Sequence, residues 1–384
     1  MPMQEEIYAL QELQTPNFHP ESDTNIDMLT AETIEKLRIL EIGDNSLFKR
    51  TYPDQTTLIW GGGHSPPSSL TEATATPEIM LRVLRDVHMR RYDIVVAYPP
   101  LYSPVHPRYW ARSIFRRPWR PWSALTRCFG TSYLRFTEFP APLVIVDLGD
   151  SAPIGSPTAA LLDNAKFAFK RELPTDRWRL LSGVAHPHLP TQRIRRSPKW
   201  ARRIAKFRPI NLPAFLWKNE FASDVFPEKT FDVFFAGSVA GNSTLRADGR
   251  AELDRLRGLG VTVDCPDQQL SDREFFARMS RAWLAWSPEG LGWQCYRHAE
   301  ACLCQSVPIM NYPTILRATP LEEGVHAFYY PPEPGGLTRT IVRALADKER
   351  LKRMAASARA HCAAHFTVKA CCDYILSTTL GAPS

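Results

Sequence analysis

The sequence has no apolar run long enough to cross a membrane and no pattern of an export signal. None of its apolar runs approaches the roughly 18 consecutive residues that a membrane-spanning helix needs. Residues 1–6 are acidic rather than basic and lead into no apolar segment, unlike the start of a secretory signal. We therefore expect a cytoplasmic protein, and we leave open its peripheral attachment to the inner face of the membrane.

Two further patterns are missing, and each absence excludes a kind of site. The eight cysteines form no Cys-x-x-Cys pair and match no standard zinc spacing, so we expect reduced thiols and no metal site. No Gly-x-Gly-x-x-Gly follows the early predicted strands, and the triplet Gly61-Gly62-Gly63 has a different spacing. This argues against a dinucleotide-dependent dehydrogenase.

The composition is that of a globular chain, with 44% apolar and 23% charged residues. At roughly 150 residues per domain, a chain of this length predicts two domains. Strand and helix patterns alternate on both sides of a stretch rich in proline, residues 209–213. We expect one lobe of residues 1–212 and a second of residues 213–384, with the last helix as a candidate to pack back on the first lobe.

Short apolar runs bounded by turn residues predict the strands, and helical spacing predicts the helices. The predicted strands are residues 57–60, 93–98, 143–147, 164–172, 231–236, 261–263, 282–286 and 307–310. The predicted helices are residues 77–90, 246–259, 271–279, 297–304, 340–346 and 350–364. Apolar strands separated by helices indicate parallel sheets covered on both faces, with ligands at the carboxyl ends of the strands.

The densest candidate for a binding site is the segment of residues 286–300. A predicted strand ends there, the loop Ser287-Pro288-Glu289-Gly290 follows, and the next helix presents Arg297 and Glu300 on one face. Loop amides and a helix N-terminus favour an anion, and a guanidinium can form paired hydrogen bonds with phosphate oxygens. A carboxylate one turn further can accept hydrogen bonds from sugar hydroxyls. The pattern indicates a site for a nucleotide-diphosphate sugar, and an ion pair between Arg297 and Glu300 is the alternative.

These residues resemble the donor-binding segment of GT-B glycosyltransferases. The loop from Ser287 to Gly290, the Arg297-x-x-Glu300-Ala301 motif and Ser306-Val307-Pro308-Ile309 look like the C-terminal lobe of that class. The Arg-x-x-Glu form is most similar to exostosin-like and related bacterial family-1-type glycosyltransferases. Residues 234–238, with Arg246 downstream, are similar to the strand and loop next to the phosphates. The resemblance covers about residues 230–375.

The resemblance implies an α/β fold of two Rossmann-like lobes with an interlobe cleft. It implies a glycosyltransferase that moves a sugar from a nucleotide-diphosphate sugar, held by the second lobe, to a hydroxyl of a glycan or lipid-linked saccharide, held by the first. No cofactor or metal is implied beyond the nucleotide-sugar co-substrate, because fixed arginines and helix-end amides can stabilise the departing diphosphate. The Arg-x-x-Glu likeness slightly favours inversion at the sugar.

The resemblance also assigns donor-binding roles by position. Glu300 would contact the ribose and Arg297 the diphosphate, while Arg246 would add positive charge near it. The implied donor-binding residues are Gly237, Ser238, Arg246, Gly290, Arg297 and Glu300.

Catalytic candidates follow predicted strands in both lobes. Glu289 at the loop tip would act on the donor sugar. A general base for the acceptor hydroxyl would come from the first lobe, where His64 and Asp150 are the main candidates and Asp147 ranks below them. Each of these three residues has a turn or capping role as its alternative.

The formal net charge of +7 is unevenly distributed. No acidic residue lies between Asp93 and Glu138, or within residues 193–208, and both runs belong to the first lobe. Three interpretations stay open: an acceptor at an anionic membrane surface, a nucleic-acid acceptor, and a solvated face. A nucleic-acid acceptor would make the protein a DNA-modifying glycosyltransferase that acts on a hydroxylated base. A non-catalytic sugar-nucleotide-binding subunit is a further alternative.

Overall fold

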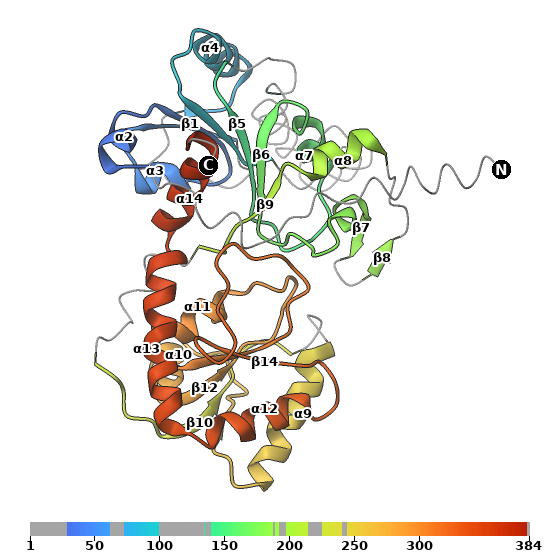
Figure 1. The fold of residues 1–384 in the computed structure, drawn as a ribbon, viewed down its shortest axis with the longest axis vertical. Helices are drawn as coiled ribbons and strands as arrows, with labels where there is room; N and C mark the ends of the chain where they lie inside the picture. The colour runs from blue at the N-terminus through green and yellow to red at the C-terminus, as the bar shows by residue number, and fades with distance from the viewer. Residues whose placement is uncertain are drawn as a thin grey trace, which may run out of the picture. The chain divides into compact units, whose positions relative to one another are not determined.

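The computed structural model describes residues 29–61, 73–99, 134, 140–186, 189–191, 197–213, 225–239 and 244–381. The chain divides into two compact units, and each contains one parallel sheet with helices packed beside it (Figure 1). The first unit comprises Met1–Pro209 together with Cys372–Ser384, and the second comprises Ile210–Cys371.

The first unit is built on a parallel sheet with the strand order β3-β2-β1-β4-β5-β6-β9 within the described residues. The strands are β1 (Ile39–Gly43), β2 (Thr56–Trp60), β3 (Ala73–Thr74), β4 (Ile94–Ala97), β5 (Leu143–Asp147), β6 (Ala165–Lys170) and β9 (Phe207–Pro209). The helices around them are α2 (Ala31–Glu35), α3 (Leu47–Thr51), α4 (Pro77–His88), α7 (Ser156–Leu161) and α8 (Pro198–Ile204). A short 3-10 helix, η3 (Arg177–Leu181), leads to an antiparallel pair, β7 (Gly183–His186) and β8 (Leu189–Thr191).

Strand β1 lies in the interior of this sheet and was not predicted from the sequence. All five of its residues are buried, including Glu41. Both carboxylate oxygens of Glu41 accept backbone N–H groups at the start of α3, from Phe48 at 3.0 Å and Lys49 at 2.8 Å, and the Tyr98 hydroxyl donates at 2.7 Å. A charged residue in the middle of an apolar run hides a strand from pattern analysis when tertiary partners satisfy it.

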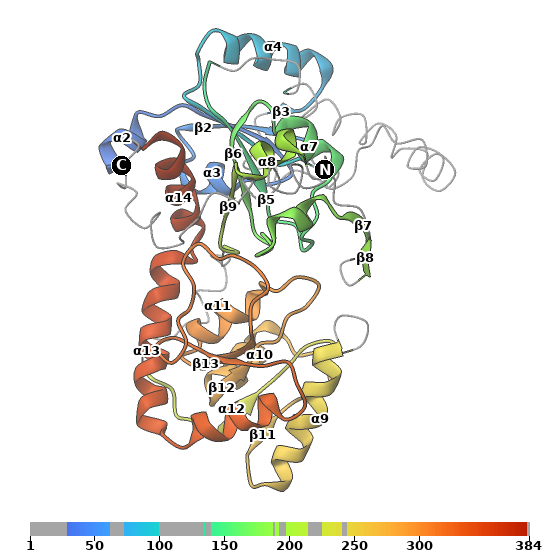
Figure 2. The same ribbon diagram turned by 45° about the vertical axis from the view of Figure 1, so that its right-hand side comes forward.

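The second unit has the parallel strand order β11-β10-β12-β13-β14. The strands are β10 (Phe231–Phe234), β11 (Val263–Asp264), β12 (Ala282–Trp286), β13 (Val307–Asn311) and β14 (Phe328–Tyr330). The helices are α9 (Thr244–Gly258), α10 (Asp272–Ser280), α11 (Tyr296–Leu303), α12 (Gly336–Leu345) and α13 (Lys348–His365). Figure 2 shows these elements from a second direction.

Apolar side chains cover both faces of this second sheet, as the sequence predicted. On one face Leu253 of α9, Ile341 of α12 and Met354 of α13 pack with Trp286 of β12. On the other face the side chains of α10 and α11 pack with the alternate residues of β10 and β12. Helix α10 begins at a capping box, in which Ser271 and Glu274 exchange hydrogen bonds.

The last helix, α14 (Val368–Leu380), ends in the first unit. Its Asp373 accepts a hydrogen bond from the Tyr52 hydroxyl, and the backbone carbonyl of Thr379 accepts one from Lys166 Nζ at 2.6 Å.

None of the helices in the described part of the chain is long and apolar enough to cross a membrane. The seven cysteines within that part are free thiols, and all but Cys295 are buried.

Candidate functional site

The loops that follow β10 and β12 meet at the carboxyl edge of the second sheet. Strand β10 ends at Phe234 and continues into the loop of residues 235–239, while β12 ends at Trp286 and continues into the loop of residues 287–295. The two strands are parallel neighbours, so their loops emerge side by side. This edge is where the sequence analysis placed the donor site.

Arg297, in the first turn of α11, reaches back to the loop after β10. Its Nη2 donates to the backbone carbonyl of Ala236 at 2.6 Å, and its guanidinium lies 5.3 Å from the ring centroid of Phe235. A Cβ atom built on Gly237 would lie 2.6 Å from that Nη2, so the absence of a side chain at Gly237 makes room for the guanidinium. The Nε of Arg297 is buried and has no hydrogen-bond partner among the described residues.

Arg246, on α9, bridges the two loops. Its Nη1 donates to the carbonyl of Ser238 at 2.9 Å, and its Nε donates to the carbonyl of Glu289, also at 2.9 Å. A Cβ atom on Gly290 would lie 2.9 Å from the Nη2 of Arg246. Burial, followed by the positive charge of Arg297, lowers the pKa of Arg246. Two guanidinium groups hydrogen-bonded to the loop after β10 favour an anion beside them.

Glu289 is held in place by Asn311, the last residue of β13. The backbone N–H of Glu289 donates to Asn311 Oδ1 at 3.0 Å, and Asn311 Nδ2 donates to the Glu289 carboxylate at 3.1 Å. Asn311 is buried, whereas Glu289 is partly exposed. The amide therefore sets the direction of a carboxylate that can still reach a ligand.

Glu300 opens onto a cavity of about 500 Å³ within the second unit. The side chain is buried, one turn of α11 beyond Arg297. The cavity is lined by Ala236, Gly237, Ser238, Pro266, Asp267, Gln268, Gln269, Leu270, Asp272, Phe275, Phe276 and Glu300. It thus begins at the loop that Arg297 holds and extends to the loop after β11.

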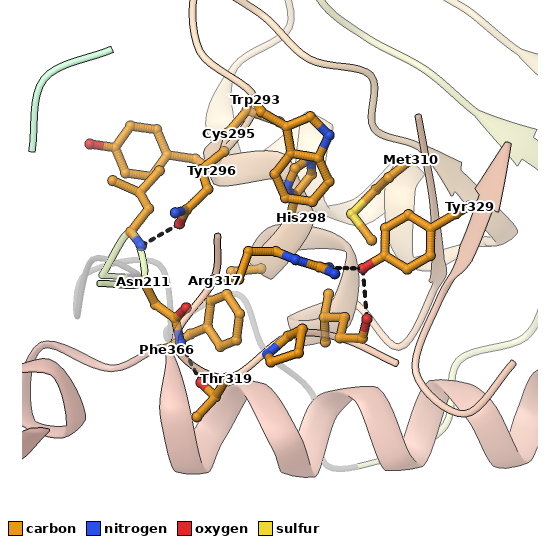
Figure 3. A pocket seen from close by; sticks show the side chains of 15 residues that line it. Asn211, Trp293, Cys295, Tyr296, His298, Met310, Arg317, Thr319, Tyr329 and Phe366 are labelled. Atoms are coloured by element: carbon orange, nitrogen blue, oxygen red, sulfur yellow. Dashed lines mark hydrogen bonds between the residues drawn. The ribbon is translucent and has the colours of Figure 1, made fainter. Parts of the chain in front are cut away.

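A second, narrow pocket lies behind the loop after β12 (Figure 3). Arg317 donates to the Tyr329 hydroxyl, and its guanidinium lies 5.3 Å from the Trp293 ring centroid. Trp293 Nε1 donates to the carbonyl of Asn311 at 3.1 Å, and His298 Nε2 lies 3.1 Å from the carbonyl of Ser287. The free space is about 20 Å³, room for one water molecule, so the rings of this pocket support the loop.

The candidate catalytic residues of the first lobe that the structure describes differ in their hydrogen bonds and ion pairs. Asp147 accepts from Lys170 Nζ at 2.8 Å and from the backbone N–H of Gly149 at 3.0 Å, the turn role that was its alternative. Asp150 pairs with Arg171 at 2.6 Å and keeps about half of its side chain exposed. His64 lies outside the described residues.

No group of three or more His, Cys, Asp or Glu side chains in the described residues is arranged to hold a metal ion. Local sequence patterns make Glu289, Arg297, Glu300 and Arg246 candidates, but they do not point to Asn311. That residue stands one position beyond a predicted strand, and its link to Glu289 becomes visible only when β12 and β13 are aligned. Gln294 was missed as well; it accepts from the backbone N–H of Leu212 at 2.7 Å.

Two parallel α/β units of this kind define a two-lobed fold of the GT-B type, which the comparison with solved structures bears out. A glycosyltransferase of Rickettsia africae has a TM-score of 0.50 at 10% identity, over 90% of this chain and 98% of that one. The prediction of two Rossmann-like lobes is confirmed, while the exostosin-like detail and the interlobe cleft stay predictions.

Two further solved structures resemble this chain less closely. Sucrose-phosphate synthase of Thermosynechococcus elongatus has a TM-score of 0.48 at 11% identity, over 89% of this chain and 98% of that one. HepE of Anabaena in complex with UDP has a TM-score of 0.47 at 14% identity, over 89% and 99%. No protein-family model and no curated protein matches the sequence.

Proposed function

We propose that the protein is a glycosyltransferase that takes its sugar from a nucleotide-diphosphate sugar bound at the carboxyl edge of the second sheet. The observation that carries this proposal is the convergence of Arg246 and Arg297 on the loops after β10 and β12. Two partly buried guanidinium groups beside loop backbone match the charge and geometry of a diphosphate.

The guanidinium of Arg297 retains capacity for a ligand. The buried Nε of Arg297, which has no partner within the described residues, would donate to a phosphate oxygen. The first turn of α11 has no side-chain cap at Cys295, so its N–H groups add to the attraction for an anion. As the glycosidic bond breaks, negative charge grows on the diphosphate, and these fixed donors stabilise it.

The other donor-site residues extend from the phosphates in two directions. Glu300, at the mouth of the 500 Å³ cavity, would accept hydrogen bonds from the ribose hydroxyls of a nucleoside in that cavity. Glu289, oriented by Asn311, would contact the donor sugar. Gly237 and Gly290 would allow the loops to approach the phosphates, because a side chain at either position would displace an arginine.

The reaction we propose is metal-independent, with the two guanidinium groups supplying the charge that a divalent ion would supply elsewhere. The acceptor is a hydroxyl of a glycan or lipid-linked saccharide bound by the first lobe, and the product has inverted configuration. Asp150 is the described candidate for the base that takes the acceptor proton, with His64 as the other candidate. The anomeric configuration of the product, read by nuclear magnetic resonance, tests the inversion.

Thermal unfolding with a panel of nucleotides tests donor binding. UDP, GDP, TDP, CMP, ADP and their sugars are added in turn, and a ligand at 100 times its Kd stabilises the folded state by about 2.7 kcal/mol. We expect one nucleoside diphosphate to raise the Tm of the native protein and to lose that effect in Arg297→Ala. Arg255→Ala, which removes an exposed arginine from α9, is the control and should respond as the native protein does. A panel without any stabilising nucleotide would contradict the proposal.

A further inference from the structure

Helix α4 of the first unit has one buried face and one exposed apolar, basic face. Met80, Val83 and Val87 are buried. On the opposite side Leu81 is 60% exposed and Met89, which follows the helix, is 59% exposed. These are the two large apolar side chains that are exposed among the described residues of the first unit.

Two arginines lie between these apolar side chains along the helix. Arg82 and Arg85 are exposed on the same side of α4 and make no ion pair within the described part of the chain. Arg91 differs, because it pairs with Asp86 at 3.1 Å. Leu81, Arg82 and Arg85, with Glu78 and Ile79, line a groove of about 440 Å³ along the helix. Helix α4 lies at the periphery of the first unit in both views (Figures 1 and 2).

We propose that this face of α4, made of Leu81, Arg82, Arg85 and Met89, docks on an anionic lipid bilayer. A helix that exposes apolar side chains and arginines on one face is suited to lie in the plane of a bilayer surface. The apolar tips enter the boundary between headgroups and acyl chains, while the guanidinium groups bind lipid phosphates and their stems cover apolar surface. A nucleic acid would offer the arginines phosphates but would leave Leu81 and Met89 in water.

The described part of the second basic run does not offer a comparable surface. Arg203 pairs with Asp163 at 2.5 Å, and Lys199 lies 3.8 Å from the same carboxylate. Lys206 Nζ donates to the backbone carbonyls of Leu162 and Ala165 at 2.6 and 2.7 Å. These three cations are engaged at the junction between α8 and the loop after α7, whereas Arg82 and Arg85 of α4 make no ion pair within the described residues.

The inference goes beyond the proposed function, because α4 carries none of the donor-site residues. One consequence rests on that function: an acceptor presented at a bilayer would be a lipid-linked saccharide rather than a free glycan. Membrane binding and donor binding are separate measurements, so one can fail while the other holds.

Co-sedimentation of the full-length protein with lipid vesicles tests the proposal. One set of vesicles is phosphatidylcholine alone, and the other is equal parts phosphatidylcholine and phosphatidylglycerol. We expect binding to the anionic vesicles, weakened by high salt, and little binding to the neutral ones. Since each arginine near an anionic surface is worth about 1 kcal/mol, Arg85→Glu should weaken binding at least about fivefold. Leu81→Glu should weaken it about tenfold.

Two substitutions in the second unit serve as matched controls. Leu259 is 69% exposed and Arg255 is exposed nearby, so Leu259→Glu and Arg255→Glu make the same chemical changes away from α4. Both should bind anionic vesicles like the native protein, and all four variants should keep the native Tm. Equal binding to both vesicle types, equal losses in the controls, or salt-sensitive retention on DNA without vesicle binding would each overturn the proposal.

Discussion

Gly237 and Arg297 are so close that a Cβ atom at the glycine would lie 2.6 Å from the guanidinium Nη2. The same nitrogen donates to the carbonyl of the preceding residue, Ala236. A side chain at position 237 would therefore require the Arg297 guanidinium to shift from the loop after β10. A substitution there tests the position of the guanidinium without removing it.

Gly237→Ala should weaken donor binding by about tenfold, because a displaced guanidinium loses charge-assisted hydrogen bonds to the phosphates. Isothermal titration with the nucleoside diphosphate found in the thermal screen measures the change. Gly258→Ala is the control, since a Cβ atom there meets nothing within 4 Å. Unchanged affinity in Gly237→Ala would show that Arg297 does not hold the diphosphate.

Asn311→Asp should slow sugar transfer by about tenfold to a hundredfold, with a smaller effect on donor affinity. The reason is that a displaced Glu289 carboxylate would lower the rate of the chemical step. The new carboxylate would face the Glu289 carboxylate, which now accepts from Asn311 Nδ2. Steady-state kinetics separate kcat from KM. The double variant Asn311→Asp/Glu289→Gln restores an amide opposite a carboxylate and should recover affinity and loop order. Additive losses in the double variant would contradict the coupling.

Gly249→Ala should lower the free energy of unfolding by about 1–3 kcal/mol, because overpacking a filled core displaces neighbours. A Cβ atom at Gly249 of α9 would overlap the six-membered ring of Trp286, which is fully buried in β12. Chemical denaturation measures the change. Gly258→Ala, near the end of the same helix, should stay close to the native value, and equal stability of the two variants would contradict the packing described for α9.

Glu41 should make stability depend on pH in the first unit. Burial raises the pKa of Glu41 to about 7, against the hydrogen bonds from Tyr98 and the α3 backbone, which lower it. A folded-state pKa above the unfolded one means that the folded state holds the proton longer as the pH rises. Between its ordinary value of 4.5 and about 7, Glu41 should therefore reduce the free energy of unfolding, by a total of about 3 kcal/mol.

Denaturation of the native protein and Glu41→Gln across that pH range checks this prediction. The variant should lose the decline, although one backbone N–H of α3 would then face an amide donor and overall stability would fall. Glu35→Gln changes an exposed glutamate and should keep the native pH dependence. A native-like decline in Glu41→Gln would assign the effect to another group.

Local patterns in the sequence predicted much of the fold. Residues 143–147 and 282–286 form strands with the predicted bounds, because their apolar runs are short and end at turn residues. Strand β1 was missed because Glu41 interrupts its apolar run, and its burial depends on Tyr98, distant in the sequence. The signal for β1 therefore lies in tertiary contacts.

In the candidate site, too, some residues could be predicted from local sequence and others depend on tertiary contacts. Arg297 and Glu300 were found because helical spacing places them on one face, whereas Asn311 was missed because its partner is on a neighbouring strand. Asp147 was a candidate from its position after a strand, and its engagement with Lys170 and Gly149 could not be read from local sequence.

The central claim is that the second unit activates a nucleotide-diphosphate sugar through Arg297 and Glu300. The most direct test is the release of nucleoside diphosphate from each sugar donor by the purified protein, measured without acceptor. The native protein should hydrolyse one donor slowly, and Arg297→Ala and Glu300→Ala should abolish that release while keeping the native Tm. Folded variants that release nucleoside diphosphate at the native rate would contradict the account.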